Sequence, residues 1–116
     1  MSILVPPFMR RPLHAFIVPH VANPVGWLHH LADDLRDAVA VAVARLTAAV
    51  DDLMTASHGE PAWNLVLHAG QGCDPLFELR PYTQAPGGYE HLGLYLCEET
   101  PATSAGRLRE ALRGGG

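Results

Sequence analysis

The sequence predicts a single α+β domain in which an antiparallel meander sheet is covered by one long and one short helix. One long segment repeats apolar residues at three- or four-residue steps, which is typical of an amphipathic helix. Short runs rich in β-branched and aromatic residues, separated by turn residues, are typical of strands. Short connections between successive strands favour antiparallel pairing, with the helices on one face. The 116 residues are enough for one domain and too few for two.

The first half of the chain is expected to hold one strand and the long helix. Residues 1–12 are predicted to be an irregular lead-in, because prolines interrupt them, and residues 14–18 a strand. Residues 27–54 are predicted to form the helix. Residues 40–44 also alternate with period two, but alanine and the longer pattern favour helix there. The helical stripe consists of Leu28, Leu31, Leu35, Val39, Val43, Leu46, Val50 and Leu53.

The second half is expected to hold three strands and the short helix. The strands are predicted at residues 62–68, 76–80 and 89–97, and the second of them alternates strictly between apolar and polar residues. Thr100 and Pro101 suit the N-cap and the first turn of the last helix. Its apolar face would carry Ala105, Leu108 and Leu112, and residues 113–116 would form a flexible tail.

Composition and charge exclude several classes of protein. The net charge is −4, and all eight basic residues are scattered arginines, so no basic stripe suggests nucleic-acid binding. No apolar run approaches the roughly 20 residues that cross a bilayer. Cys73 and Cys97 form neither a disulfide framework nor a metal knuckle. Without an evident signal peptide, we expect a cytoplasmic protein with reduced cysteines.

Four strings in order give the chain a resemblance to a known family. They are AWNLVLH at 62–68, FELRP at 77–81, GYE at 88–90 and AGRLR at 105–109. In order and spacing they resemble the histidine-triad-like fold, and more narrowly the C-terminal half of galactose-1-phosphate uridylyltransferases. The resemblance implies a dimeric transferase of galactose metabolism, which carries out nucleotidyl transfer from a nucleotide sugar to a hexose 1-phosphate.

Two departures from the family weaken the case for catalysis by this chain alone. The family's nucleophile is a histidine in a His-Pro-His string of the other half, and this sequence contains no such string. Leu76 stands where the family's histidine-rich strand has a histidine. The sequence therefore predicts no catalytic residue of its own and an inactive isolated chain, whose reaction would need a partner chain carrying the catalytic half. The alternative is a degenerate, non-catalytic domain kept for dimerisation or ligand binding.

Tyr89 and Glu90 are the substrate-binding residues that the resemblance implies. In the family, the Gly-Tyr-Glu loop reaches the active site of the neighbouring subunit, and these two residues contact the hexose phosphate. A phenol and a carboxylate suit sugar hydroxyls. The family's basic and aromatic residues before the loop are replaced by residues 84–86, Gln-Ala-Pro, so a weaker grip on a sugar phosphate or nucleotide sugar is expected.

A metal site is the weaker possibility. By resemblance His68 matches a metal-binding histidine, and Asp74 and Glu78 could add oxygens for a divalent ion such as zinc or iron. The alternative is that His68 is an ordinary strand-end residue and Glu78 a solvent-facing carboxylate. Because Leu76 replaces a ligand, the sequence favours the absence of a metal.

The remaining candidate residues give no chemical signal. Neighbouring His29 and His30 on a helix would diverge by about 100° and could not chelate one ion together. Trp27 and Trp63 are interpreted as core or interface anchors. The other histidines lack ligand spacing, and the serines lack the setting of a nucleophile elbow. These residues are His14, His20, His58, His91, Ser2, Ser57 and Ser104.

Overall fold

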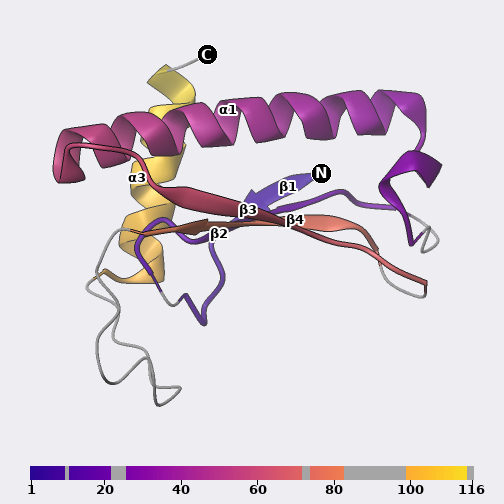
Figure 1. Cartoon of the computed structure of the whole chain (residues 1–116), viewed down its shortest axis with the longest axis horizontal. Helices are drawn as coiled ribbons and strands as arrows, with labels where there is room; N and C mark the ends of the chain where they lie inside the picture. Colours follow the sequence, from indigo (N-terminus) through magenta and orange to yellow (C-terminus); the bar gives the residue numbers. More distant parts are fainter. Residues whose placement is uncertain (10, 22–25, 72–73, 83–98, 115–116) are drawn as a thin grey trace.

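The computed structural model describes residues 1–9, 11–21, 26–71, 74–82 and 99–114. These residues include four strands, one 3₁₀ turn and two α-helices (Figure 1). They follow one another as β1 (Ser2–Leu4), β2 (Ala15–Val18), η1 (Leu28–His30), α1 (Asp33–His58), β3 (Trp63–His68), β4 (Leu76–Pro81) and α3 (Pro101–Gly114).

The predicted α+β class with an antiparallel sheet is confirmed. The strand order is β1-β2-β4-β3, and every neighbouring pair is antiparallel. The predicted meander order is wrong, because β4 lies between β2 and β3. The chain crosses from β2 to β3 through α1, so these two consecutive strands are not neighbours. The expected strand at 89–97 lies outside the described residues.

Strand β1 was not expected, because residues 1–12 were predicted to be irregular. Ile3 pairs with Ile17 of β2, which places this three-residue strand at the edge of the described sheet. Three residues are too few for an alternation to reveal a strand, and pairing with β2 defines this one.

The long helix α1 runs along one face of the sheet, and α3 packs against it (Figure 1). The predicted stripe is buried at Val39, Leu46 and Val50, while Leu35 and Val43 are half-buried. Leu46 and Val50 form the main buried cluster with residues of the strands and of α3, and Val43 packs against it. The buried cluster consists of Leu13, Ala15, Ile17, Ala42, Leu46, Val50, Met54, Leu79 and Leu108.

The predicted bounds of the long helix are wrong at both ends. Residues 28–30 form a 3₁₀ turn instead of the first helical turn, because Leu31 and Ala32 adopt extended ψ angles of 149° and 146°. At the other end α1 continues to His58 and stops at Gly59, whose φ of 86° is readily adopted only by glycine. Within the described ranges, neither helix combines the length and the apolar character that crossing a membrane requires.

Candidate functional site

A cleft of about 570 Å³ lies on the sheet face opposite α1. Side chains alternate between the two faces of a strand, so Phe77 and Leu79 of β4 point to the core while Glu78 and Arg80 point to the cleft. The segment before β2, Phe16 of β2 and residues at or beside the ends of β3 and β4 supply the rest. The lining residues are Phe8, Arg11, His14, Phe16, His68, Asp74, Leu76, Glu78, Arg80 and Tyr82.

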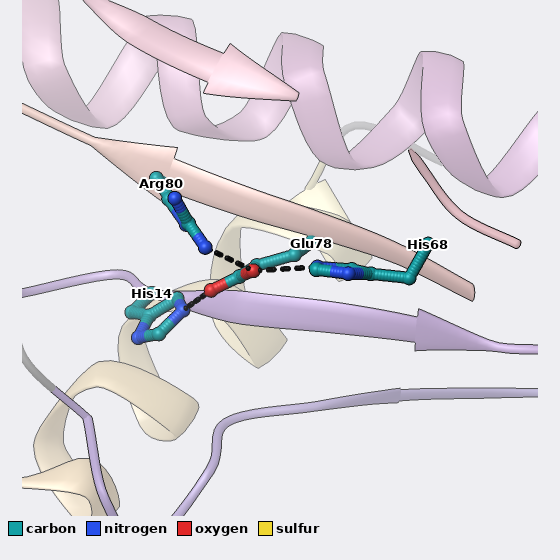
Figure 2. A network of polar contacts seen from close by, with 4 residues as sticks. All are labelled: His14, His68, Glu78 and Arg80. Carbon is teal, nitrogen blue, oxygen red and sulfur yellow. Dashed lines mark hydrogen bonds and ion pairs between the residues drawn. The ribbon is translucent and has the colours of Figure 1, made fainter. Parts of the chain in front are cut away.

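The carboxylate of Glu78 is the centre of a polar network in this cleft (Figure 2). One oxygen, Oε2, lies 2.6 Å from Nε2 of His14. The other, Oε1, lies 2.8 Å from Nε2 of His68 and 2.9 Å from Nη2 of Arg80. An ionised carboxylate can only accept hydrogen bonds, so both imidazoles must carry a proton on Nε2 and donate it.

The strand register explains why these side chains meet. In the antiparallel pairing, Glu78 stands opposite Phe16 of β2 on one side and Val66 of β3 on the other. His68 pairs with Leu76, and a diagonal neighbour two residues along is within reach of a long side chain. Arg80 follows Glu78 on the same face.

Glu78 is held as an anion. It is 6% exposed. Burial by itself raises the pKa of this carboxyl group, but the hydrogen bonds from Arg80 and the two histidines outweigh it and lower the pKa to about 2. A carboxylate that remains ionised and already accepts three donors is a poor proton donor at neutral pH. It therefore orients its neighbours instead of exchanging protons.

The structure brings the expected metal residues near one another without forming a ligand set. Asp74 lines the same cleft as His68 and Glu78. In the parts of the chain that are described, no three His, Cys, Asp or Glu side chains are placed to hold a metal ion. The idea that Glu78 is solvent-facing is wrong, because hydrogen bonds replace water around it. Leu76 contributes an apolar wall to the cleft.

Aromatic rings also line the cleft. The ring of Phe8 makes edge contacts with His14 and Phe16, at centroid separations of 6.5 and 6.1 Å. Phe8 is nevertheless 63% exposed, so one side of its ring remains open to solvent. The guanidinium carbon of Arg11 lies 5.0 Å from the centroid of the Tyr82 ring.

Like Arg80, His14 is a site residue that the sequence did not indicate. It is 4% exposed and lies just before β2, and its partner Glu78 is 64 positions away. The spacing of histidines along the sequence cannot reveal a carboxylate on a strand whose pairing is unknown. Alternation along residues 14–18 is the available signal, because it places His14 and Phe16 on one face of the predicted strand.

The structure also places the histidine pair, both tryptophans and Ser2. His29 and His30 lie in η1, not in the long helix, and their ring centroids are 4.2 Å apart, so the expected divergence is wrong. Trp63 packs against the core, whereas Trp27 is 47% exposed. The hydroxyl of Ser2 lies 2.7 Å from Nε2 of His20.

The proposed hexose contacts and both cysteines fall outside the described residues, as does one histidine. These residues are Tyr89, Glu90, Cys73, Cys97 and His91. The side chains of Ser57 and His58 are not described either.

Comparison with known proteins identifies the fold. No model of a known protein family matches the sequence, and no curated protein does. Among solved structures, 93% of the chain matches an ADP-glucose phosphorylase from Arabidopsis thaliana with bound ADP-glucose, at a TM-score of 0.74 and 18% identity. A GalT-like protein from the same plant matches with the same TM-score, identity and coverage. A uridylyltransferase matches over 97% of the chain, at a TM-score of 0.78 and 21% identity.

The match involves only part of each neighbour. The chain spans 36%, 37% and 38% of the three proteins respectively, which is well under half of their length. The fold of this chain is therefore the one that forms part of uridylyltransferases and of the ADP-glucose phosphorylase.

Proposed function

We propose that this chain is a uridylyltransferase-like domain that binds a sugar phosphate or a nucleotide sugar in the cleft around Glu78. The observation that carries the proposal is the cleft itself, which combines two arginines with aromatic rings in a fold shared with a protein that has ADP-glucose bound. Its volume of about 570 Å³ is in the range typical of small-molecule sites.

Each wall of the cleft suits one part of such a ligand. Arg11 and Arg80 line the cleft, and because a guanidinium group has five N–H donors, Arg80 can contact a phosphate oxygen while it binds Glu78. The exposed face of Phe8 can stack on a nucleobase or on the apolar face of a sugar ring. Glu78 orients the side chains of Arg80 and His68 through its hydrogen bonds to them.

Nucleotidyl transfer would need a second chain. A covalent nucleotide intermediate requires a nucleophile, and the uridylyltransferases that this chain resembles use the histidine of a His-Pro-His string, which is absent from the sequence. We therefore propose that a partner chain contributes it, and that the domain also pairs with a second copy of itself. Tyr89 and Glu90 are proposed to contact the hexose, as the resemblance implies.

A titration tests ligand binding directly. UDP-glucose, ADP-glucose and glucose 1-phosphate are added to the ¹⁵N-labelled chain, with glucose as the ligand that lacks phosphate. The phosphorylated ligands should shift the signals of Arg11, Phe16 and Arg80, and glucose should not. Arg11→Gln should weaken binding by about tenfold, because one charge-assisted contact is worth about 1.5–3 kcal/mol. The exposed Arg113→Gln of α3 serves as the matched control. If no NMR signal shifts at millimolar concentrations of the phosphorylated ligands, the proposed binding function is wrong.

The second candidate is a non-catalytic domain, and one observation favours it. Glu78 already accepts hydrogen bonds from three donors and its pKa is lowered to about 2, so this carboxyl group is a poor proton donor at neutral pH. The two candidate functions differ in whether a partner chain makes the domain catalytically active. Mixing the chain with a protein that carries a His-Pro-His half should give uridylyl transfer in the first case. Ligand binding without transfer would support the second.

A further inference from the structure

The turn that leads into β2 holds an unusual backbone conformation at Leu13. The amide of His14 donates to the carbonyl oxygen of Arg11 at 3.2 Å, which closes a four-residue turn with Pro12 second and Leu13 third. The φ angle of Leu13 is 65°. Pro followed by a residue with positive φ is the pattern of a type II turn, where the third position normally takes Gly or Asn. A leucine is strained in this conformation because of its Cβ atom. The side chain of Leu13 is fully buried in the core.

A hydroxyl from α3 holds this strained residue. The amide of Leu13 donates to Oγ of Ser104 at 2.9 Å, although the two residues are 91 positions apart. Ser104 is fully buried, and its hydroxyl donates in turn to Oε2 of Glu99. Nη1 of Arg107 binds the other oxygen of Glu99 at 2.5 Å.

The direction of these bonds determines what Ser104 does. A carboxylate only accepts, so the hydroxyl proton of Ser104 points to Glu99, and a lone pair is left facing the amide of Leu13. Arg107 fixes the carboxylate and thereby the hydroxyl. A buried hydroxyl without hydrogen-bond partners would destabilise the fold. The hydroxyl of Ser104 has two described partners, the amide of Leu13 in the turn and the carboxylate of Glu99.

We propose that Ser104 is a positioning residue for the cleft: by holding Leu13 it aims the imidazole of His14 at Glu78. His14 follows Leu13 directly, and its Nε2 lies 2.6 Å from the carboxylate that also orients Arg80. A change in the φ angle of Leu13 would swing the side chain of the next residue. The helix α3 therefore sets the geometry of a site to which it contributes no lining residue. The effect on ligand affinity rests on the proposed function, whereas the effect on His14 does not.

Ser104→Ala tests this proposal in the full chain, with Val39→Ala as the control. Val39 is buried in α1 outside the cluster that contains Leu13, so its truncation destabilises the protein without touching the turn. The ¹H–¹⁵N signals of the His14 ring should shift and broaden in Ser104→Ala and keep their wild-type positions in Val39→Ala. The affinity for UDP-glucose should fall about fivefold to tenfold in Ser104→Ala alone, as for the loss of roughly one hydrogen bond. Ser104→Thr, which keeps the hydroxyl, should restore both.

Three further outcomes decide between the possible roles of Ser104 and the proposed function. If Ser104→Ala leaves the His14 signals as unchanged as Val39→Ala does, Ser104 is only a structural residue and the proposal is overturned. Should Ser104→Ala fail to fold, Glu99→Gln loosens the same hydroxyl from outside the buried core. It should shift the His14 ring in the same direction, and an unaltered ring would overturn the proposal. If the wild type binds no nucleotide sugar, the proposed function fails, while the ring signals still decide the role of Ser104.

Discussion

The indole Nε1–H of Trp63 in β3 donates a 2.6 Å hydrogen bond to Oδ1 of Asp51 in α1. This bond joins the sheet to the last third of the helix that covers it, and the Trp63 ring also packs against the core. A partly buried aromatic residue with a satisfied N–H combines apolar burial with a fixed orientation. Trp63 therefore anchors α1 on the sheet.

Trp63→Phe should destabilise the protein by about 1–2 kcal/mol, through loss of this hydrogen bond and of some apolar area. Urea unfolding followed by circular dichroism measures the change. Asp51→Asn keeps an oxygen acceptor and should cost less. Equal effects of Asp51→Ala in the wild-type and Trp63→Phe backgrounds would show that the two residues are not coupled.

The pKa of Glu78 predicts a specific loss of stability in acid. The pKa is about 2 in the folded protein against 4.5 as the ordinary value, so folding is favoured by ionised Glu78 above pH 4.5. That contribution, on the order of 3 kcal/mol, should be lost as the pH falls from about 4.5 towards 2. Glu78→Gln should be less stable than wild type at pH 7, and the difference should shrink across this window.

The control for the acid experiment is Glu110→Gln, which changes an exposed carboxylate of α3. It should follow the wild-type curve of unfolding free energy against pH. A Glu78→Gln curve that runs parallel to wild type from pH 5 to 2 would contradict the network in the cleft.

Truncation of apolar side chains on α1 should cost much more stability at a buried position than at an exposed one. Leu46 is 0% exposed, and Leu46→Ala should cost about 2–5 kcal/mol because it leaves a cavity in the core. Val41 on the same helix is 58% exposed, and Val41→Ala should change the unfolding free energy by less than about 0.5 kcal/mol. Similar costs at both positions would mean that α1 packs with a different face.

The isolated chain should form no covalent nucleotide adduct. Incubation with UDP-glucose followed by intact-mass spectrometry should show only the unmodified protein, because the sequence has no His-Pro-His string and the described cleft centres on an ionised carboxylate. A mass increase of one uridylyl group, mapped to His68 or His14, would reveal a nucleophile within this chain and overturn the need for a partner.

Self-association should be measurable by sedimentation at increasing concentration. Large apolar side chains are exposed at both the sheet edge and the helix, including Leu4 and Val41 at 41% and 58%. A dimer is the expected species. The charged variant Val41→Glu should weaken association if the α1 face takes part, and a purely monomeric wild type at high concentration would count against the proposal.

Much of the fold can be predicted from local patterns in the sequence. The 3.6-residue period along α1 and the alternation in β4 identify a helix and a half-buried strand without reference to the rest of the chain. The N-cap is equally local, since the amide of Thr103 does donate to Oγ1 of Thr100 as expected. The strand β1 had no such signal, because three residues carry too little periodicity.

The site depended on contacts that no local pattern encodes. His14 reaches Glu78 across 64 positions, and Ser104 reaches Leu13 across 91. The sequence by itself determined the α+β class, the order of its main elements and which face of each would be apolar, because these follow from the spacing of neighbouring residues. Only the tertiary structure decided the register of β2 on β4, and with it the burial of Glu78 among three donors. Strand register depends on packing between segments that are distant in the chain, and it places every side chain on one face or the other.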